Sequence, residues 1–171
     1  MELAREKLAQ SSLVRLRVSS DSMAPLIEQG DTVLVRSVHP RDLRRGDLLL
    51  VERDGSFLVH RLVAAGAHDV QTKGDNVSHA DPAVALQEVL GRVVAMERGG
   101  RRIELEEGRW PLVNRSLGLL GWYEVRLFAA GRKVKRRLVG ARSGRLTRGL
   151  ASLAAVPFRW MTRLLLMRIR P

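Results

Sequence analysis

Residues 47–63 of the chain read DLLLVERDGSFLVHRLV and carry a strong signal of the fold. Apolar runs at 48–51 and 57–63 flank the pair Asp54-Gly55. An Asp-Gly pair between two such runs is a strong signal for a hairpin, because both residues tolerate the backbone angles of a tight turn. The stretch therefore predicts two antiparallel strands joined by a short turn.

Similar short segments lie on both sides of this hairpin. Residues 13–18 alternate apolar and basic side chains, the period-two pattern of a strand. Further β-type runs follow at regular spacing, with Gly or Asp at many of the turns; they are residues 32–35, 70–73, 89–96 and 102–105. Short strands at regular spacing predict a mainly β fold, a domain whose strands are mostly antiparallel.

Composition excludes several classes of protein. The chain has 171 residues, enough for one main domain and an appendage. It has no Cys, which excludes disulfide scaffolds, Cys-based zinc sites and thiol catalysis. A hydrophobic content of 45% argues against a disordered chain. No apolar run is long enough for a membrane span, and residues 1–10 lack the apolar core of a secretory signal peptide.

The charge is distributed unevenly along the chain. Residues 1–108 hold 15 basic and 17 acidic residues, a net charge of −2. Residues 109–171 hold 15 basic residues and one acid, Glu124, a net charge of +14. We therefore predict a near-neutral β domain over 1–108 and a basic helical extension over 109–171.

A few residues of the first part are candidates for nucleophilic catalysis. The segment 19–25, SSDSMAP, follows the first predicted strand and is rich in hydroxyl groups. A serine becomes a nucleophile when a base removes its proton, and His60 lies on a predicted strand. A carboxylate must then orient the imidazole, for which Asp75 and Asp81 are the candidates. By pattern alone this triad is a weak signal, and serines that cap a turn are the alternative interpretation.

No metal or cofactor is predicted. A metal site built from His79, Asp75 and Asp81 matches no common ligand spacing.

Taken in order, the motifs of residues 12–96 resemble type I signal peptidases. The similarity is to the branch of archaea and the endoplasmic reticulum, which is related to the self-cleaving repressor peptidases. The segments that carry it are SDSMAP at 20–25, Gly30-Asp31, Gly46-Asp47, VHR at 59–61, TKGDN at 72–76 and VLGRV at 89–93. The resemblance implies a peptidase on a folded-over, mainly antiparallel β scaffold.

The resemblance also implies roles for single residues. Ser22 corresponds to the nucleophile, and His60 occupies the position where bacterial signal peptidases use a lysine base. Ser20, with the backbone N–H of Ser22, corresponds to the group that binds the oxyanion. Asp81 matches the later carboxylate of this branch and is preferred over Asp75. We also expect Met23 and Pro25 to contact the substrate.

The distribution of lysines supports a histidine base. The lysines of the chain are Lys7, Lys73, Lys133 and Lys135, and none lies in the predicted strand of His60. This favours a Ser–His mechanism over a Ser–Lys dyad.

Two departures from the family pattern keep another function open. Asp21 stands between the two serines where the family usually has Gly, and no membrane anchor precedes the serine in this sequence. We therefore expect a serine endopeptidase that cleaves a precursor or leader peptide after a small residue, rather than general removal of signal peptides. The alternative is a catalytically inactive module of the same fold that binds peptides or acts as a scaffold.

The basic extension predicts a partner. Between residues 150 and 169, helical periodicity gathers Trp160 and aliphatic side chains on one face. The arginines of the opposite face are Arg148, Arg159, Arg163 and Arg170. This pattern favours a helix in the interface of an anionic membrane, which predicts a cytoplasmic protein, peripheral on the inner face of the cell membrane. The alternatives are packing on the β domain, or a nucleic acid or acidic protein as partner; no motif for specific nucleic-acid binding is present. The oligomeric state is not predicted.

Overall fold

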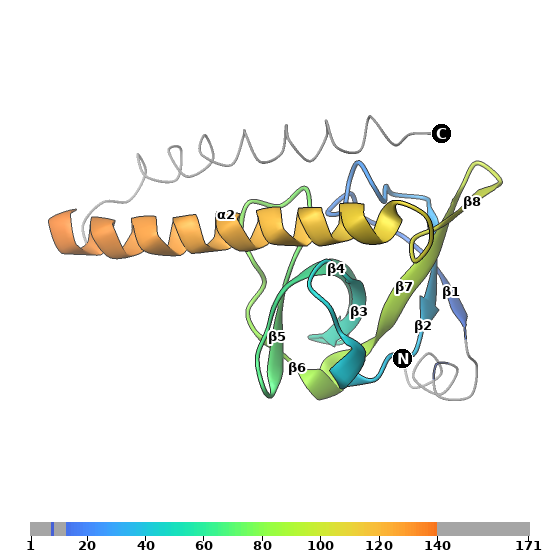
Figure 1. The fold of residues 1–171 in the computed structure, drawn as a ribbon, viewed down its shortest axis with the longest axis horizontal. Helices are drawn as coiled ribbons and strands as arrows, with labels where there is room; N and C mark the ends of the chain where they lie inside the picture. The colour runs from blue at the N-terminus through green and yellow to red at the C-terminus, as the bar shows by residue number, and fades with distance from the viewer. Residues whose placement is uncertain (1–7, 9–12, 140–171) are drawn as a thin grey trace.

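We analysed a computed structural model of the chain, which describes residue 8 and residues 13–139, with side chains up to residue 131. The chain forms one eight-stranded sheet that curls on itself, with a long helix across one end (Figure 1). All the pairs are antiparallel. The prediction of a mainly antiparallel β domain followed by a helix is confirmed.

Seven of the eight strands coincide with runs predicted from sequence, and the two-residue strand β6 was not predicted. The eight strands are β1 (Val14–Arg17), β2 (Thr32–Arg36), β3 (Leu48–Arg53), β4 (Ser56–Ala65), β5 (Asp69–Lys73), β6 (Val84–Ala85), β7 (Val89–Arg98) and β8 (Arg101–Glu104). In the sheet they lie in the order β1-β2-β7-β3-β4-β5-β6, and β8 also pairs with β7. Two 3₁₀ turns, η1 (Pro40–Asp42) and η2 (Leu86–Glu88), precede β3 and β7. The helix α2 (Trp110–Val139) follows β8.

The β3–β4 hairpin forms as the Asp-Gly pair predicts. Arg53 lies opposite Ser56, and both turn residues have positive φ, 48° at Asp54 and 71° at Gly55. Positive φ at both positions is the geometry of the tight turns that match the twist of a hairpin.

The apolar run of β3 is buried on both faces. Leu48 and Leu50 pack into one cluster with the β1–β2 side of the sheet, and Leu49 and Val51 pack into a second with β4–β6. A strand buried on both faces reads as a continuous apolar run, which explains why residues 48–51 lack alternation.

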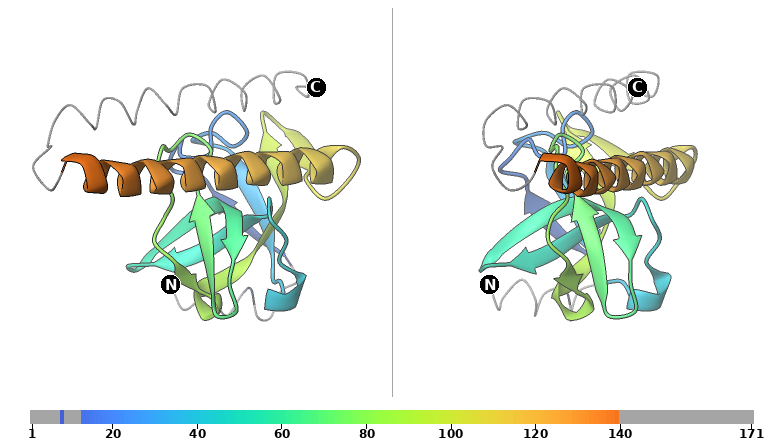
Figure 2. Two further views of the ribbon diagram at one scale, coloured as in Figure 1. Left: turned by 60° about the vertical axis from the view of Figure 1, so that its left-hand side comes forward. Right: turned by 90° about the vertical axis from the view of Figure 1, so that its left-hand side faces the viewer.

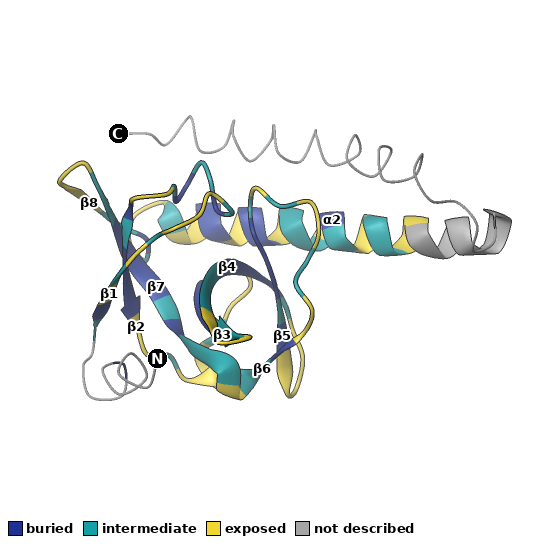
Figure 3. Cartoon of the chain, turned by 180° about the vertical axis from the view of Figure 1, so that it is seen from behind, coloured by how far each residue is buried: buried dark blue, intermediate teal, exposed yellow. Residues whose placement is uncertain are grey.

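Helix α2 closes the molecule on one side (Figures 1 and 2). Val113 and Leu117 belong to the first cluster, while the opposite side of the helix is exposed (Figure 3). The approach is close: a Cβ on Gly118 would lie 2.5 Å from the backbone nitrogen of Gly46. The first half of α2 therefore lies directly on the β domain, and its C-terminal end extends beyond the strands (Figure 1).

Several sequence predictions fall outside this description. The amphipathic segment at 150–169, with Trp160 and its arginines, lies outside the described residues, as does most of the charged start of the chain. No helix within residues 13–139 is long and apolar enough to cross a membrane. The division at residue 108 stays a prediction.

Candidate active site

The loop between β1 and β2 carries the serines. It is closed at its base by backbone hydrogen bonds between Val18 and both Gly30 and Asp31. Ser22 is half-buried and Ser20 is exposed, with 3.3 Å between their Oγ atoms. Because the two hydroxyl groups are within hydrogen-bonding distance, Ser20 can donate to an oxygen that develops charge beside Ser22.

The carboxylate of Asp21 is directed away from this pair. Its Oδ1 accepts a hydrogen bond from the backbone N–H of Gln29 at 2.9 Å. Its backbone is also unstrained, since Asp54 is the one non-glycine residue with positive φ in the described part of the chain. Asp21 therefore fits the loop, and its carboxylate accepts a hydrogen bond from the backbone of Gln29.

His60 lies on β4 and contacts Asp81. The Nδ1 atom of His60 is 2.6 Å from Oδ2 of Asp81, and their side chains are 5% and 12% exposed. Thr72 on β5 donates a second hydrogen bond to the same oxygen at 2.7 Å. An N–H at Nδ1 that donates to Asp81 leaves a lone pair on Nε2, so this carboxylate holds the tautomer in which Nε2 accepts a proton.

The environment of Asp81 favours its charged form. Burial raises the pKa of Asp81, but hydrogen bonds from His60 and Thr72 lower it, as do the positive charges of His60 and Arg53. The net effect is a pKa below the usual value for an aspartate. Asp81 is therefore ionised at neutral pH and stabilises positive charge on the imidazole.

The turn that follows β5 brings the serine loop and His60 together. A Cβ on Gly74 would lie 2.7 Å from the carbonyl oxygen of Ser22 and 2.9 Å from Nε2 of His60. The backbone N–H of Asn76 donates to that same carbonyl oxygen at 2.9 Å, and its side-chain amide donates to the carbonyl of Asp21 at 3.1 Å. Only a glycine leaves room for this contact, so the Gly-Asp-Asn turn holds Ser22 beside His60.

The Nε2 atom of His60 is left without a partner. Within the described residues it is buried and makes no hydrogen bond. A buried polar nitrogen without a partner has a free energy cost, and such groups often have a chemical role. Its position beside the Ser22 loop suits a base that accepts the proton of a hydroxyl.

Asp75 has a different partner from Asp81. The Arg61 guanidinium donates two hydrogen bonds to it, from Nε at 2.8 Å and from Nη2 at 2.7 Å. The remaining Nη1 donates to the carbonyl of Gly46 at 2.8 Å and to Oδ1 of Asn114 at 2.9 Å. Arg61 is 1% exposed, so this buried network fastens the turn to β4, to the loop before β3 and to α2.

Lys73 is also committed to a structural contact. Its Nζ lies 2.9 Å from Oε2 of Glu124 and donates to the carbonyl of Gly74 at 3.1 Å. Both charged side chains are 5% exposed. Glu124 is the one acid of the basic extension, and it faces inward to pair with Lys73. Helix α2 therefore holds the turn at 73–76 in two ways, directly through Glu124 and indirectly through Asn114, which accepts from Arg61.

A cavity of about 410 Å³ opens beside the two serines. It is lined by both serines and Met23, and it continues between β1 and the first residues of β4. Met23 is 2% exposed and belongs to the apolar core as well. Pro25 is half-buried and is not part of the lining, so the structure places only Met23 of the predicted substrate contacts in this cavity.

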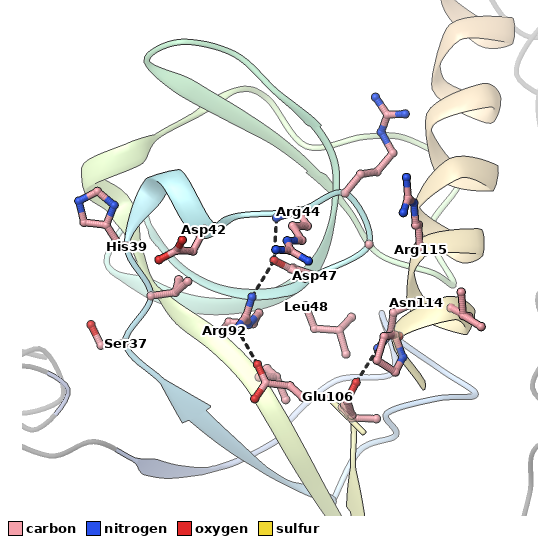
Figure 4. A pocket seen from close by; sticks show the side chains of 17 residues that line it. Ser37, His39, Asp42, Arg44, Asp47, Leu48, Arg92, Glu106, Asn114 and Arg115 are labelled. Carbon is pink, nitrogen blue, oxygen red and sulfur yellow. Dashed lines mark hydrogen bonds and ion pairs between the residues drawn. The ribbon is translucent and has the colours of Figure 1, made fainter. Parts of the chain in front are cut away.

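A larger cavity of about 610 Å³ lies elsewhere, between η1, β7 and the start of α2 (Figure 4). Three of its charged groups pair with one another: Arg92 contacts Asp47 at 3.3 Å and Glu106 at 2.6 Å. Ser22 does not line it, whereas Ser22 does line the smaller cavity. We therefore assign the chemistry to the smaller cavity.

The possible metal ligands are not assembled. His79 is exposed, while Asp75 and Asp81 have the separate partners described above. Within the described residues no group of three His, Asp or Glu side chains is arranged to hold a metal ion.

A comparison with models of known protein families assigns the chain to a family. Residues 1–94 match the model of the Peptidase S24-like family, and this range contains the serine loop, His60 and both aspartates. The chain belongs to the Peptidase S24-like family. No curated protein matches the sequence. Membership supports a serine peptidase or self-cleaving domain, and the matched range ends before α2 begins.

Sequence reasoning missed four residues of this S24-like site. Asn114 carries no signal that separates it from other polar residues. Thr72 and Gly74 both lie in the TKGDN motif at 72–76, but their contacts depend on the folded chain. Glu124 had a signal: a single acid among fifteen basic residues suggests a specific partner.

Proposed function

We propose that the chain is a serine endopeptidase of the signal-peptidase type, in which Ser22, His60 and Asp81 form the catalytic triad. The observation that carries this proposal is the bond between His60 and Asp81 at 2.6 Å, with the free Nε2 of His60 beside the Ser22 loop. A buried carboxylate that orients an imidazole next to a serine is the arrangement that activates a hydroxyl for acyl transfer.

The chemical steps follow from these atoms. The Oγ atom of Ser22 attacks the carbonyl carbon of the scissile peptide bond, and Nε2 of His60 takes its proton. The hydroxyl of Ser20 and the backbone N–H of Ser22 donate to the oxygen that becomes negative. His60 then gives the proton to the departing amine, and an ester forms at Ser22. A water molecule, deprotonated by His60, hydrolyses this ester and restores the serine.

The free strand edges beside the cavity suit an extended substrate. β1 pairs only with β2 among the described strands, and residues 56–60 of β4 pair only with β3 because β5 begins to pair at Arg61. Both segments line the cavity that contains Ser22. A peptide in extended conformation can add to such an edge through main-chain hydrogen bonds. Buried Met23 is among the lining residues of this cavity, and we propose a small side chain before the cleaved bond.

The lysine alternative is disfavoured by geometry. The Nζ atom of Lys73 lies 2.9 Å from Oε2 of Glu124. Lys73 is the one lysine whose side chain the structure describes, and this ion pair engages its charge. His60, not Lys73, carries the free nitrogen beside the serine loop.

A mixture of synthetic peptides with varied sequence, analysed by mass spectrometry, tests the proposal. We expect the wild-type protein to produce new peptide ends after small residues, and Ser22→Ala to produce none at an unchanged melting temperature. The matched control is Ser56→Ala, an exposed serine that also lines the cavity, which should retain cleavage. Equal cleavage by Ser22→Ala would contradict the mechanism. Tight peptide binding without cleavage by the wild type would favour the inactive binding module instead.

The proposed location is the cytoplasm, at the inner face of the cell membrane, with an anionic lipid surface as partner and a membrane-associated precursor or leader peptide as substrate. The support is the net charge of +14 on residues 109–171 together with the apolar side chains that this part of the chain exposes.

A further inference from the structure

Helix α2 has two faces with different composition. The inner face packs on the β domain through Val113 and Leu117 and carries Glu124 to Lys73. The outer face exposes large apolar side chains; they are Leu112, Leu119, Tyr123 and Leu127, which are 71%, 38%, 56% and 63% exposed. These four are the exposed large hydrophobic residues of the part of the chain that the structure describes, and all of them lie on this one helix.

The spacing of these residues makes a continuous stripe. At 100° per residue, positions 112, 119, 123 and 127 fall within about 80° of one another. From Leu112 to Leu127 the stripe is about 22 Å long at 1.5 Å per residue. A stripe of this kind on a soluble domain marks a surface that is covered in use.

The charges beside the stripe are positive. Arg115 and Arg126 are exposed and lie on one flank of it at helical spacing. The guanidinium of Arg126 lies 4.5 Å from the ring centre of Trp122, and that of Arg45 lies 5.0 Å from the same ring. The helix's one acid is buried on the opposite face, so within the described side chains of α2 no carboxylate opposes these cations.

We infer that the outer face of α2 binds an anionic lipid surface, with the apolar stripe inserted at the level of the headgroups and Arg115 and Arg126 at the phosphates. Apolar side chains flanked by arginine are the combination that an interfacial helix uses. A nucleic acid would use the cations but would leave the leucines in water. A second copy would bring two strongly basic surfaces together.

This inference rests on the proposed membrane location and is independent of the chemistry at Ser22. It identifies the lipid-facing surface within the described structure, separately from the segment at 150–169. Glu124 joins the inner face of α2 to Lys73, and Asn114 joins it to Arg61, which pairs with Asp75. A helix held on lipid therefore keeps the proposed active site at the membrane surface.

Flotation of the full chain with vesicles tests the surface. We expect binding to vesicles that contain phosphatidylserine, little binding to vesicles of phosphatidylcholine alone, and weaker binding in high salt. Leu112→Gln/Leu127→Gln should weaken binding roughly tenfold or more, because apolar insertion is lost while a good helix former is kept. Cleavage of a soluble peptide should be unchanged in this variant, and Ser22→Ala should bind vesicles as the wild type does.

The charge contribution has a matched control. Arg115→Gln/Arg126→Gln should weaken binding roughly tenfold, whereas Arg41→Gln/Arg101→Gln, which removes two exposed arginines from η1 and β8, should not. Wild-type binding that survives both α2 variants would overturn the inference, since residues 140–171 would then carry it. Absence of binding by the wild type would overturn it as well.

The absence of cysteine allows a direct readout of the surface. A polarity-sensitive dye on Leu119→Cys should shift to the blue when anionic vesicles are added, and the same dye on Arg101→Cys should not. A blue-shifted signal at position 119 before vesicles are added, at protein concentrations where sedimentation shows a monomer, would mean that the chain covers its own stripe. The same signal with a dimer would mean that a second copy covers it. Either result would overturn the inference.

Discussion

Two carboxylates of the site have separate partners, and this separation predicts different defects. Asp81→Asn should lower kcat by about 10²–10⁴ with a smaller loss of stability than Asp75→Asn, because only Asp81 contacts the imidazole. Asp75→Asn should mainly lower stability, by about 3 kcal/mol, because it leaves the Arg61 guanidinium, 1% exposed, without its countercharge. Peptide kinetics and urea unfolding of both variants measure the two effects. Equal losses of kcat at unchanged stability would contradict these assignments.

Acid should weaken the fold partly through Asp81. Burial raises its pKa, but the bonds from His60 and Thr72 bring the net value below the usual one. A carboxyl whose folded pKa lies below its unfolded value of about 3.9 stabilises the fold above that pH, and the stabilisation disappears as pH falls through the folded pKa. We therefore expect the stability difference between wild type and Asp81→Asn to shrink below about pH 4. A difference that stays constant from neutral pH to about pH 3 would contradict this linkage.

The neighbouring residues His60 and Arg61 show what the sequence could and could not predict. Sequence and family resemblance identified His60 and both aspartates. They could not assign the carboxylates from spacing alone, because adjacent strand residues face opposite sides and the partner of each depends on strand register. In the structure Arg61 lies opposite Lys73 on β5, and this register gives Asp81 to His60 and Asp75 to Arg61.

At the level of elements, the strands were more predictable than the helix. Alternation and Asp-Gly or Gly-Gly turns located every strand of four or more residues, while β6, with two residues, was too short to leave a pattern. The packing of α2 was not predictable, because it depends on the contact of Gly118 with Gly46, far away in sequence. Charge alone suggested that residues 109–171 form a separate extension, whereas Val113 and Leu117 of α2 belong to the core of the β domain.

Two glycines of α2 make a matched test of this packing. Gly118→Ala should destabilise the fold by about 1–3 kcal/mol, since its Cβ would lie 2.5 Å from the Gly46 backbone. It should also lower kcat, because α2 supports the turn at 73–76 through Glu124 and Asn114. Gly131→Ala, with nothing within 4 Å, should stabilise the fold by about 0.5–1 kcal/mol through helix propensity. Thermal melts and peptide cleavage measure both variants. The packing account is wrong if Gly118→Ala behaves like Gly131→Ala.

At the level of the whole molecule, α2 joins the S24-like domain to the basic end of the chain. The family match ends at residue 94, yet Glu124 of α2 pairs with Lys73 and Asn114 of α2 accepts from Arg61. Beyond the matched range the helix therefore supports the candidate site on one face and exposes apolar side chains on the other. This arrangement links the candidate active site to a candidate membrane surface through one helix.

Truncation tests where the folded unit ends. A chain of residues 1–139 should melt cooperatively, near the temperature of the full chain. A chain of residues 1–107 should melt at a much lower temperature or aggregate, because it lacks Val113 and Leu117 of the core, leaves Lys73 without its countercharge and removes the Asn114 acceptor from Arg61. Circular dichroism and sedimentation report both outcomes. A shorter chain as stable as the longer one would show instead that the division at residue 108 separates an independent domain.

The central claim is that His60 activates Ser22, and reaction with a small fluorophosphonate tests it most directly without knowledge of the substrate. We predict that intact-mass and peptide mapping place one adduct on Ser22 Oγ in the wild type. The rate should fall roughly 10²–10⁴-fold in His60→Ala, and no adduct should form in Ser22→Ala. Modification of another serine, or equal rates in wild type and His60→Ala with intact folds, would contradict the account.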